Sequence, residues 1–99
     1  MKIEELAPLL EKIAPLAHSE ETNDIYKSVY DAIAAANTPS IAQSVCSYVI
    51  TMCHPKAWGD QYVTIFGPGM LSWNTYLGEL SEVANECGQK IHENYRGIG

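Results

Sequence analysis

The stretch from Ser72 to Arg96, SWNTYLGELSEVANECGQKIHENYR, decides the fold class. Its apolar residues recur at alternating steps of four and three: Trp73, Leu77, Leu80, Ala84, Cys87 and Ile91. This spacing places them on one face of a helix, which predicts a long amphipathic helix packed against other helices. Four acidic residues fall opposite this stripe, where we expect solvent: Glu79, Glu82, Glu86 and Glu93.

Two helices are predicted at the N-terminal end. The first covers Lys2 to Ala17, and its regular part should begin near Ala7. We expect Pro15 to kink or end it, because an interior proline removes a backbone donor and crowds the preceding turn. The second helix is predicted to run from a cap at Ser19 to about Ala36, since serine accepts hydrogen bonds from the first helical turn.

A third helix is predicted from Pro39 to about His54, with Thr38 as its cap. Two apolar stripes lie side by side on it: Ile41, Val45, Tyr48 and Met52, and Ala42, Cys46, Val49 and Cys53. So wide an apolar arc is typical of a central helix that packs on more than one side. We therefore expect this helix to be the most buried part of the fold.

Residues 55–67 allow two interpretations. The run from Tyr62 to Phe66 is rich in β-branched and aromatic residues and could form a strand. Aromatic rings at steps of four, on Trp58, Tyr62 and Phe66, favour a short helix, because a lone strand would have no partner. The sequence Gly67-Pro68-Gly69 then breaks the chain. Together these patterns predict a single all-α domain over residues 1–99, a compact bundle of four to five helices with a Pro/Gly-broken loop near 67–69.

Composition narrows the function. The hydrophobic fraction of 46% against 18% charged residues excludes a disordered tail. A net charge of −6 and a single arginine, Arg96, argue against direct binding to nucleic acid or to an anionic membrane. The uncharged stretch from Ala32 to Pro55 is too interrupted by polar residues for a membrane span. Three cysteines and an N-terminus without an apolar leader predict a reducing, cytoplasmic setting.

No pattern in the sequence indicates catalysis, a metal site or a cofactor. Cys53 adjoins His54, but neighbouring residues on a helix project about 100° apart and do not converge on one ion. Cys87 and His92 are also off one face, being five residues apart. The paired glutamates are expected in solvent, where carboxylates make poor general acids. We therefore expect a protein that is not an enzyme.

One segment has the composition of a contact patch. No charged residue lies between Asp60 and Glu79, and aromatic residues crowd into this part of the chain. Interface centres are enriched in aromatic residues and methionine and depleted of charge. The predicted partner-binding residues are Trp58, Tyr62, Phe66, Gly67, Pro68, Gly69 and Met70. The alternative is that these rings close the core under a loop.

Pro68 adds a second hypothesis. The bond before proline adopts the cis form appreciably, and the flanking glycines favour display of a tight turn. We hypothesise that this turn is a recognition element whose isomer matters and on which a prolyl isomerase acts. Unchanged partner affinity and binding kinetics in Pro68→Ala would exclude this role.

Taken together, the length of 99 residues, the acidic helical character, the reduced cysteines and the segment from Trp58 to Met70 with Gly67-Pro68-Gly69 resemble the small anti-RecBCD proteins of lambdoid phages. The resemblance implies a non-enzymatic protein that binds the host RecBCD helicase-nuclease on its RecC subunit. It further implies that binding alters the response of the host enzyme to recombination signals, which spares phage DNA ends and favours phage recombination.

Other classes of function remain open. An acidic immunity or antitoxin protein would neutralise a basic partner, and its association would weaken strongly with salt. A DNA mimic would present the glutamates of the C-terminal helix in place of phosphates. A small regulatory bundle would dimerise through Trp58 and Phe66, which sedimentation measures directly. The sequence leaves the oligomeric state and the isomer at Pro68 undetermined.

Overall fold

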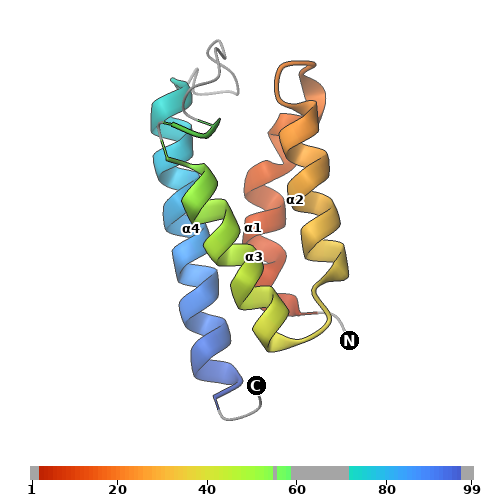
Figure 1. Cartoon of the computed structure of the whole chain (residues 1–99), viewed down its shortest axis with the longest axis vertical. Coiled ribbons are helices and arrows are strands. Elements are labelled where there is room, and N and C mark those ends of the chain that lie inside the picture. Colours follow the sequence, from red (N-terminus) through yellow and green to blue (C-terminus); the bar gives the residue numbers. More distant parts are fainter. Residues whose placement is uncertain (1–2, 55, 59–71, 97–99) are drawn as a thin grey trace.

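The computed structural model of the chain describes residues 3–54, 56–58 and 72–96. These residues form helices and connecting turns, with no strand among them, so the predicted all-α class is confirmed for this part of the chain. The elements are η1 (Glu4–Leu6), α1 (Ala7–Ile13), η2 (Ala14–His18), α2 (Asn23–Ala35), α3 (Pro39–Met52) and α4 (Trp73–Asn94). The four α-helices run alternately up and down (Figure 1).

Helix α4 forms as the sequence predicts. Every member of its apolar stripe is buried: Trp73, Leu77, Leu80, Ala84, Cys87 and Ile91. Its first turn is capped by Ser72, whose Oγ accepts a hydrogen bond from the backbone N–H of Thr75 at 3.2 Å. Helix α4 contacts both α1 and α3, whereas α2 packs against η2, α3 and α1.

Prolines divide the N-terminal segment as expected. The regular helix α1 begins at Ala7, with Pro8 in its first turn, and ends at Ile13. The chain continues as the 3₁₀ helix η2, in whose first turn Pro15 lies. The predicted break at Pro15 is therefore confirmed, because a helix tolerates proline only in its first turn.

The start of α2 differs from the prediction. The helix begins at Asn23, and residues 20–22 form a turn. The Oγ of Ser19 accepts a hydrogen bond from the N–H of Glu21 at 3.3 Å, so it caps the turn and not the helix. The buried Thr22 explains the shift, because its Oγ1 donates to the carbonyl oxygen of Leu16 at 2.7 Å and holds the turn against η2.

Helix α3 packs along α4, and its start is as predicted. Thr38 Oγ1 accepts from the N–H of Ile41 at 3.2 Å, and Pro39 occupies the first turn. The residues that α3 buries are Pro39, Ala42, Val45, Cys46 and Val49. Contacts of α3 with both α2 and α4 confirm that it packs on more than one side, but its outer surface is open to solvent: Ile41 is 43% exposed and Tyr48 is 38% exposed.

Long-range hydrogen bonds fasten the helices to one another. The hydroxyl of Tyr76 on α4 donates to the backbone carbonyl of Lys12 on α1 at 2.7 Å. At the other end of α4, Glu5 accepts hydrogen bonds from Asn94 at 2.8 Å and from Tyr95 at 3.1 Å. These two hydrogen bonds stabilise the ionised carboxylate and so lower the pKa of Glu5, and the bond from Asn94 is the larger cause.

Candidate functional site

Trp58 is the one predicted partner-binding residue within the described part of the chain. Its side chain is only 5% exposed, and its carbonyl oxygen accepts a hydrogen bond from Nε1 of Trp73 at 2.8 Å. The expectation that Trp58 is an exposed anchor is therefore corrected: the ring closes the core, as the alternative interpretation has it. The remaining predicted positions lie outside the described residues: Tyr62, Phe66, Gly67, Pro68, Gly69 and Met70.

The outer surface of α3 has the features of a docking site. We call it the α3 face, and it comprises Ser40, Ile41, Ser44, Ser47, Tyr48, Ile50 and Thr51, all exposed. The large apolar side chains exposed in the described structure are Tyr30, Ile41, Tyr48 and Ile50. Ile41 and Tyr48, seven residues apart, share one edge of the α3 face, whereas Ile50 projects from its opposite edge, because successive residues of a helix are turned by about 100°. The face also lacks charge, because α3 contains no Lys, Arg, Asp or Glu.

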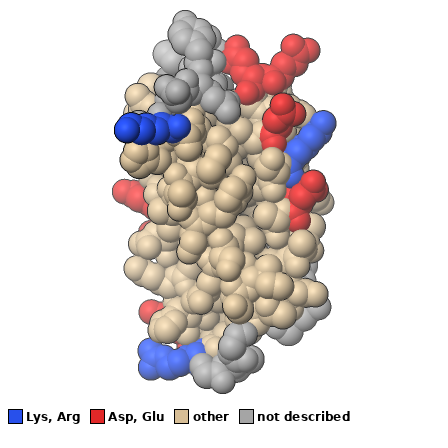
Figure 2. Space-filling model, viewed as in Figure 1, with Lys and Arg blue, Asp and Glu red and all other residues tan. Residues whose placement is uncertain are grey.

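Figure 2 shows this distribution on one side of the molecule. The middle of the view, over α3, is uncharged, and the acidic side chains stand at its margins. Solvent-facing helix surfaces of monomeric proteins usually carry charged residues. In a chain of net charge −6, an uncharged helix surface with protruding Ile41 and Tyr48 is the chemistry expected of an interface centre.

Tyr48 links this face to the segment that the sequence analysis singled out. Its ring lies edge-on to the ring of Trp58, with centroids 5.9 Å apart and planes at 86°. Edge-to-face contacts of this kind stabilise a ring position. The buried Trp58 therefore holds the exposed Tyr48 in a defined orientation, which lowers the entropy that binding would have to overcome.

Sequence reasoning missed the α3 face because it interpreted an uncharged helix as a buried one. A signal was nevertheless present. A helix buried on all sides is apolar all round, whereas α3 interleaves Ile41 and Tyr48 with the hydroxyls of Ser40, Ser44 and Ser47. Of these hydroxyls, Ser44 donates to the carbonyl of Ser40 at 3.2 Å within its own helix. This mixture of hydroxyl and apolar side chains fits a surface that is exposed in the free chain.

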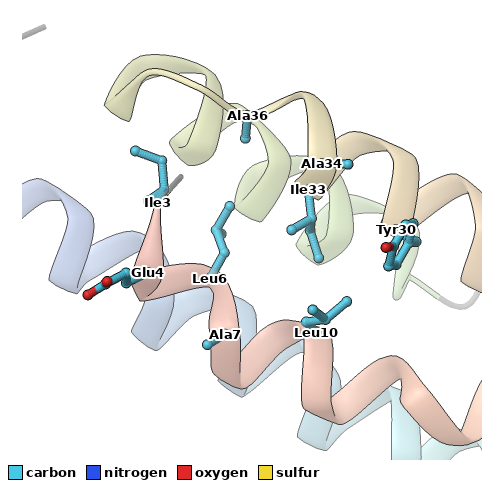
Figure 3. Close-up of a pocket in the computed structure, with 9 residues that line it drawn as sticks. All are labelled: Ile3, Glu4, Leu6, Ala7, Leu10, Tyr30, Ile33, Ala34 and Ala36. Carbon is cyan, nitrogen blue, oxygen red and sulfur yellow. The ribbon is translucent and has the colours of Figure 1, made fainter. Parts of the chain in front are cut away.

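A second candidate is an apolar groove between α1 and α2. Leu6, Ala7 and Leu10 line one side, and Ile33 and Ala34 line the other (Figure 3). Its volume is about 770 Å³, within the usual range of ligand pockets. The polar side-chain groups among its described lining are the Glu4 carboxylate and the Tyr30 hydroxyl. The groove can bury apolar surface, but two polar groups at its edges do little to orient a reacting molecule.

The three thiols are poorly suited to nucleophilic chemistry. Burial, with a smaller effect of the neighbouring Cys87 thiol, raises the pKa of Cys46 to about 12. Burial likewise raises the pKa of Cys53 to about 11 and raises that of Cys87. These raised pKa values keep all three groups protonated at neutral pH. Because the thiolate is the reactive form, the groups are poor nucleophiles. They act as small apolar side chains between α3 and α4.

One of the four glutamates expected in solvent has a different environment. Glu79 is half-buried, and its Oε1 lies 2.6 Å from Nζ of Lys12 on α1. The same ammonium group lies 5.4 Å from the centre of the Tyr76 ring. Glu79 thus joins α4 to α1, which corrects the prediction for this residue. Its three companions are exposed as predicted: Glu82, Glu86 and Glu93.

The described residues hold no group of three or more His, Cys, Asp or Glu side chains placed to bind a metal ion. Within the same residues, no helix combines the length and apolar character that crossing a membrane requires. Comparisons of the chain with protein-family models, with curated proteins and with solved structures find no match.

Proposed function

We propose that this protein is a non-enzymatic inhibitor or modulator that acts by binding a larger protein through the α3 face. The observation that carries the proposal is the exposure of Ile41 at 43% and of Tyr48 at 38% on a helix without charge. Folding leaves these side chains in water, so their apolar area is available for association. The large aromatic side chain of Tyr48 belongs to a residue type that dominates interface energies.

The partner that we propose is the host RecBCD helicase-nuclease, bound at its RecC subunit. The resemblance to anti-RecBCD proteins of lambdoid phages names this partner. Binding would alter the response of RecBCD to recombination signals, spare phage DNA ends and favour phage recombination. The proposal retains the segment from Tyr62 to Met70 as a further contact and Pro68 as a site for a host prolyl isomerase.

The size of the surface is compatible with such a role. Helix α3 spans 14 residues, which at about 1.5 Å per residue gives a ridge roughly 21 Å long. A standard interface buries roughly 800 Å² on each partner. The α3 face can form the centre of such an interface, with residues beside it completing the contact.

The test measures binding of the purified chain to purified RecBCD by biolayer interferometry. We expect Tyr48→Ala to weaken binding about tenfold or more, the usual loss for an aromatic anchor at an interface centre. We expect Ile41→Ser to weaken it less but measurably. Tyr30→Ala on α2 is the matched control, because Tyr30 is 44% exposed but lies off the α3 face. Circular dichroism establishes that each variant is folded.

Each other outcome has a defined meaning. Absence of wild-type binding to RecBCD would overturn the partner. Equal losses in Tyr48→Ala and Tyr30→Ala would overturn the α3 face. Affinity that falls steeply with salt and ignores Tyr48→Ala would favour the acidic immunity, antitoxin or DNA-mimic classes, because exposed charge pairs are screened by salt.

A further inference from the structure

A furrow runs along the seam between α3 and α4. Three hollows follow one another in it: the first and second share Gln43, and the second and third share Ile50. The first reaches Arg96 at the C-terminal end of α4, and the third reaches Lys56 beyond the end of α3. On α3, which runs antiparallel to α4 (Figure 1), the lining begins at Pro39 and reaches Thr51, so the furrow extends along nearly the whole of this helix.

The charge of this furrow is opposite to that of the chain. The chain contains 12 acidic residues, yet none of them is among the described residues that line the three hollows. Basic side chains stand at both ends, with Arg96 at one and Lys56 at the other. Figure 2 shows basic side chains near the upper and lower ends of the left edge of this face, and acidic side chains on the same edge between them. Between the basic ends the lining includes the neutral amides of Gln43, Asn85 and Gln89.

A glycine in the furrow leaves room for a partner. Gly78 lies in the interior of α4, where glycine is less favourable than alanine. A Cβ atom built on Gly78 meets none of the described heavy atoms within 4 Å, so packing inside the described chain does not require a glycine there. Gly88 differs, because its Cβ would lie 3.5 Å from Cβ of Cys46. The open space at Gly78 allows the backbone of another molecule to approach closely.

We propose that the furrow between α3 and α4 seats a helix of the partner protein that carries carboxylate side chains toward both of its ends. This inference rests on the proposed function, since it specifies how the partner is held. A groove between two packed helices accepts a third helix by interdigitation of side chains. Basic groups at the two ends, Lys56 and Arg96, select acidic groups at a matching separation, and the central amides accept polar contacts.

The first test uses Gly78→Ala with RecBCD as the binding partner. We expect this variant to raise the urea midpoint of unfolding, because alanine favours the helix, and yet to bind RecBCD about fivefold or more weakly, because the methyl group obstructs close approach. A stabilising substitution that lowers affinity cannot be explained by loss of fold. Unchanged or tighter binding by Gly78→Ala would overturn the furrow as the seat.

The second test reverses charge at the two ends. We expect Lys56→Glu and Arg96→Glu each to weaken RecBCD binding severalfold at low salt and by less at high salt. The matched control is Lys27→Glu on α2, which makes the same charge change on an exposed residue away from the furrow and should leave affinity unchanged. Equal effects of all three would overturn the furrow in favour of a general charge effect.

The outcomes separate this inference from the proposed function. If wild-type chain binds RecBCD and Tyr48→Ala weakens it, but Gly78→Ala and the end reversals do not, the furrow is wrong and the function stands. If wild-type chain does not bind RecBCD, the proposed partner is overturned, and this inference falls with it. When wild-type chain binds, a photoreactive residue in place of Asn85 identifies the occupant by mass spectrometry: a cross-link to a RecC helix supports the proposal, and one to an extended segment overturns it.

Discussion

Helices α3 and α4 pack against each other, yet they divide their side chains differently. Helix α4 buries its apolar stripe and turns charged residues such as Glu82, Glu86 and Glu93 to solvent. Helix α3 also buries an apolar stripe, but its outer surface exposes Ile41, Tyr48 and Ile50 without any charge. A helix needs one apolar face to join a bundle. The exposed Ile41 and Tyr48 of α3 are therefore surplus to folding, and that surplus locates the proposed docking site.

The largest expected effect tests whether that surplus is real. Leu80 on α4 is fully buried, so Leu80→Ala should lower the free energy of unfolding by about 3 kcal/mol, from lost burial and the cavity that remains. Ile41 on α3 is 43% exposed, so Ile41→Ser should change it by less than about 1 kcal/mol. Urea unfolding followed by circular dichroism measures both.

The distinction between α3 and α4 would be lost if Leu80→Ala and Ile41→Ser lowered the free energy of unfolding by similar amounts. A loss for Ile41→Ser close to that for Leu80→Ala would mean that Ile41 contributes to the core of the folded chain. The α3 face would then have no surplus, and its apolar side chains would be explained by stability alone. Met52, which is only partly exposed on the same helix, provides an intermediate reference through Met52→Ala.

Local signals in the sequence predicted most of the described fold. The stripe of α4, the cap at Thr38 and the break at Pro15 each depend on residues within one or two turns. The start of α2 escaped prediction because it depends on Thr22 bonding to Leu16 in η2, a contact that no spacing rule reveals. Patterns within a segment therefore predicted the elements better than they predicted the contacts between them.

The candidate site was harder to predict for a related reason. Periodicity shows which residues share a face, but the fold decides which face is covered. Tyr48 was expected in the core and is exposed. Trp58 was expected to bind a partner and is buried against Trp73. The two rings lie in contact, so the prediction misjudged which of two neighbouring rings is exposed.

A smaller effect concerns the thiols where α3 meets α4. Burial raises the pKa of Cys46 from its ordinary value of 9.0 to about 12 in the folded chain. The unfolded chain loses this proton near pH 9, whereas the folded chain keeps it until the pH approaches about 12. The stabilising contribution of the protonated thiol is therefore fully present below pH 9 and is lost as the pH rises toward 12. The free energy of unfolding should fall by about 2 kcal/mol between pH 9 and pH 11 from this thiol.

Cys46→Ala isolates that contribution. The variant is expected to be less stable than wild type at pH 8, because a buried side chain is shortened, but to lose less stability as the pH rises. Urea unfolding at intervals between pH 8 and pH 11 measures the two slopes. Identical slopes in wild type and Cys46→Ala would show that this thiol titrates as freely in the folded chain as in the unfolded one, and that α3 is not tightly packed on α4.

The smallest expected effect compares how the two helices begin. Thr38 and Ser72 each accept a hydrogen bond of 3.2 Å from the first turn of α3 and of α4, respectively. Thr38→Ala and Ser72→Ala should each lower the free energy of unfolding by about 1 kcal/mol, and Thr38→Ser and Ser72→Thr should restore most of it. The caps lie at opposite ends of the bundle, so the double variant should lose the sum of the two single losses in free energy of unfolding.

Equal losses in Thr38→Ala and Ser72→Ala would show that α3 depends on its cap as much as α4 does. The uncharged outer surface of α3 could not then be attributed to a helix that forms only weakly, and recognition would remain its explanation. A cost confined to Ser72→Ala would instead mean that α3 is held by its packing on α4 alone.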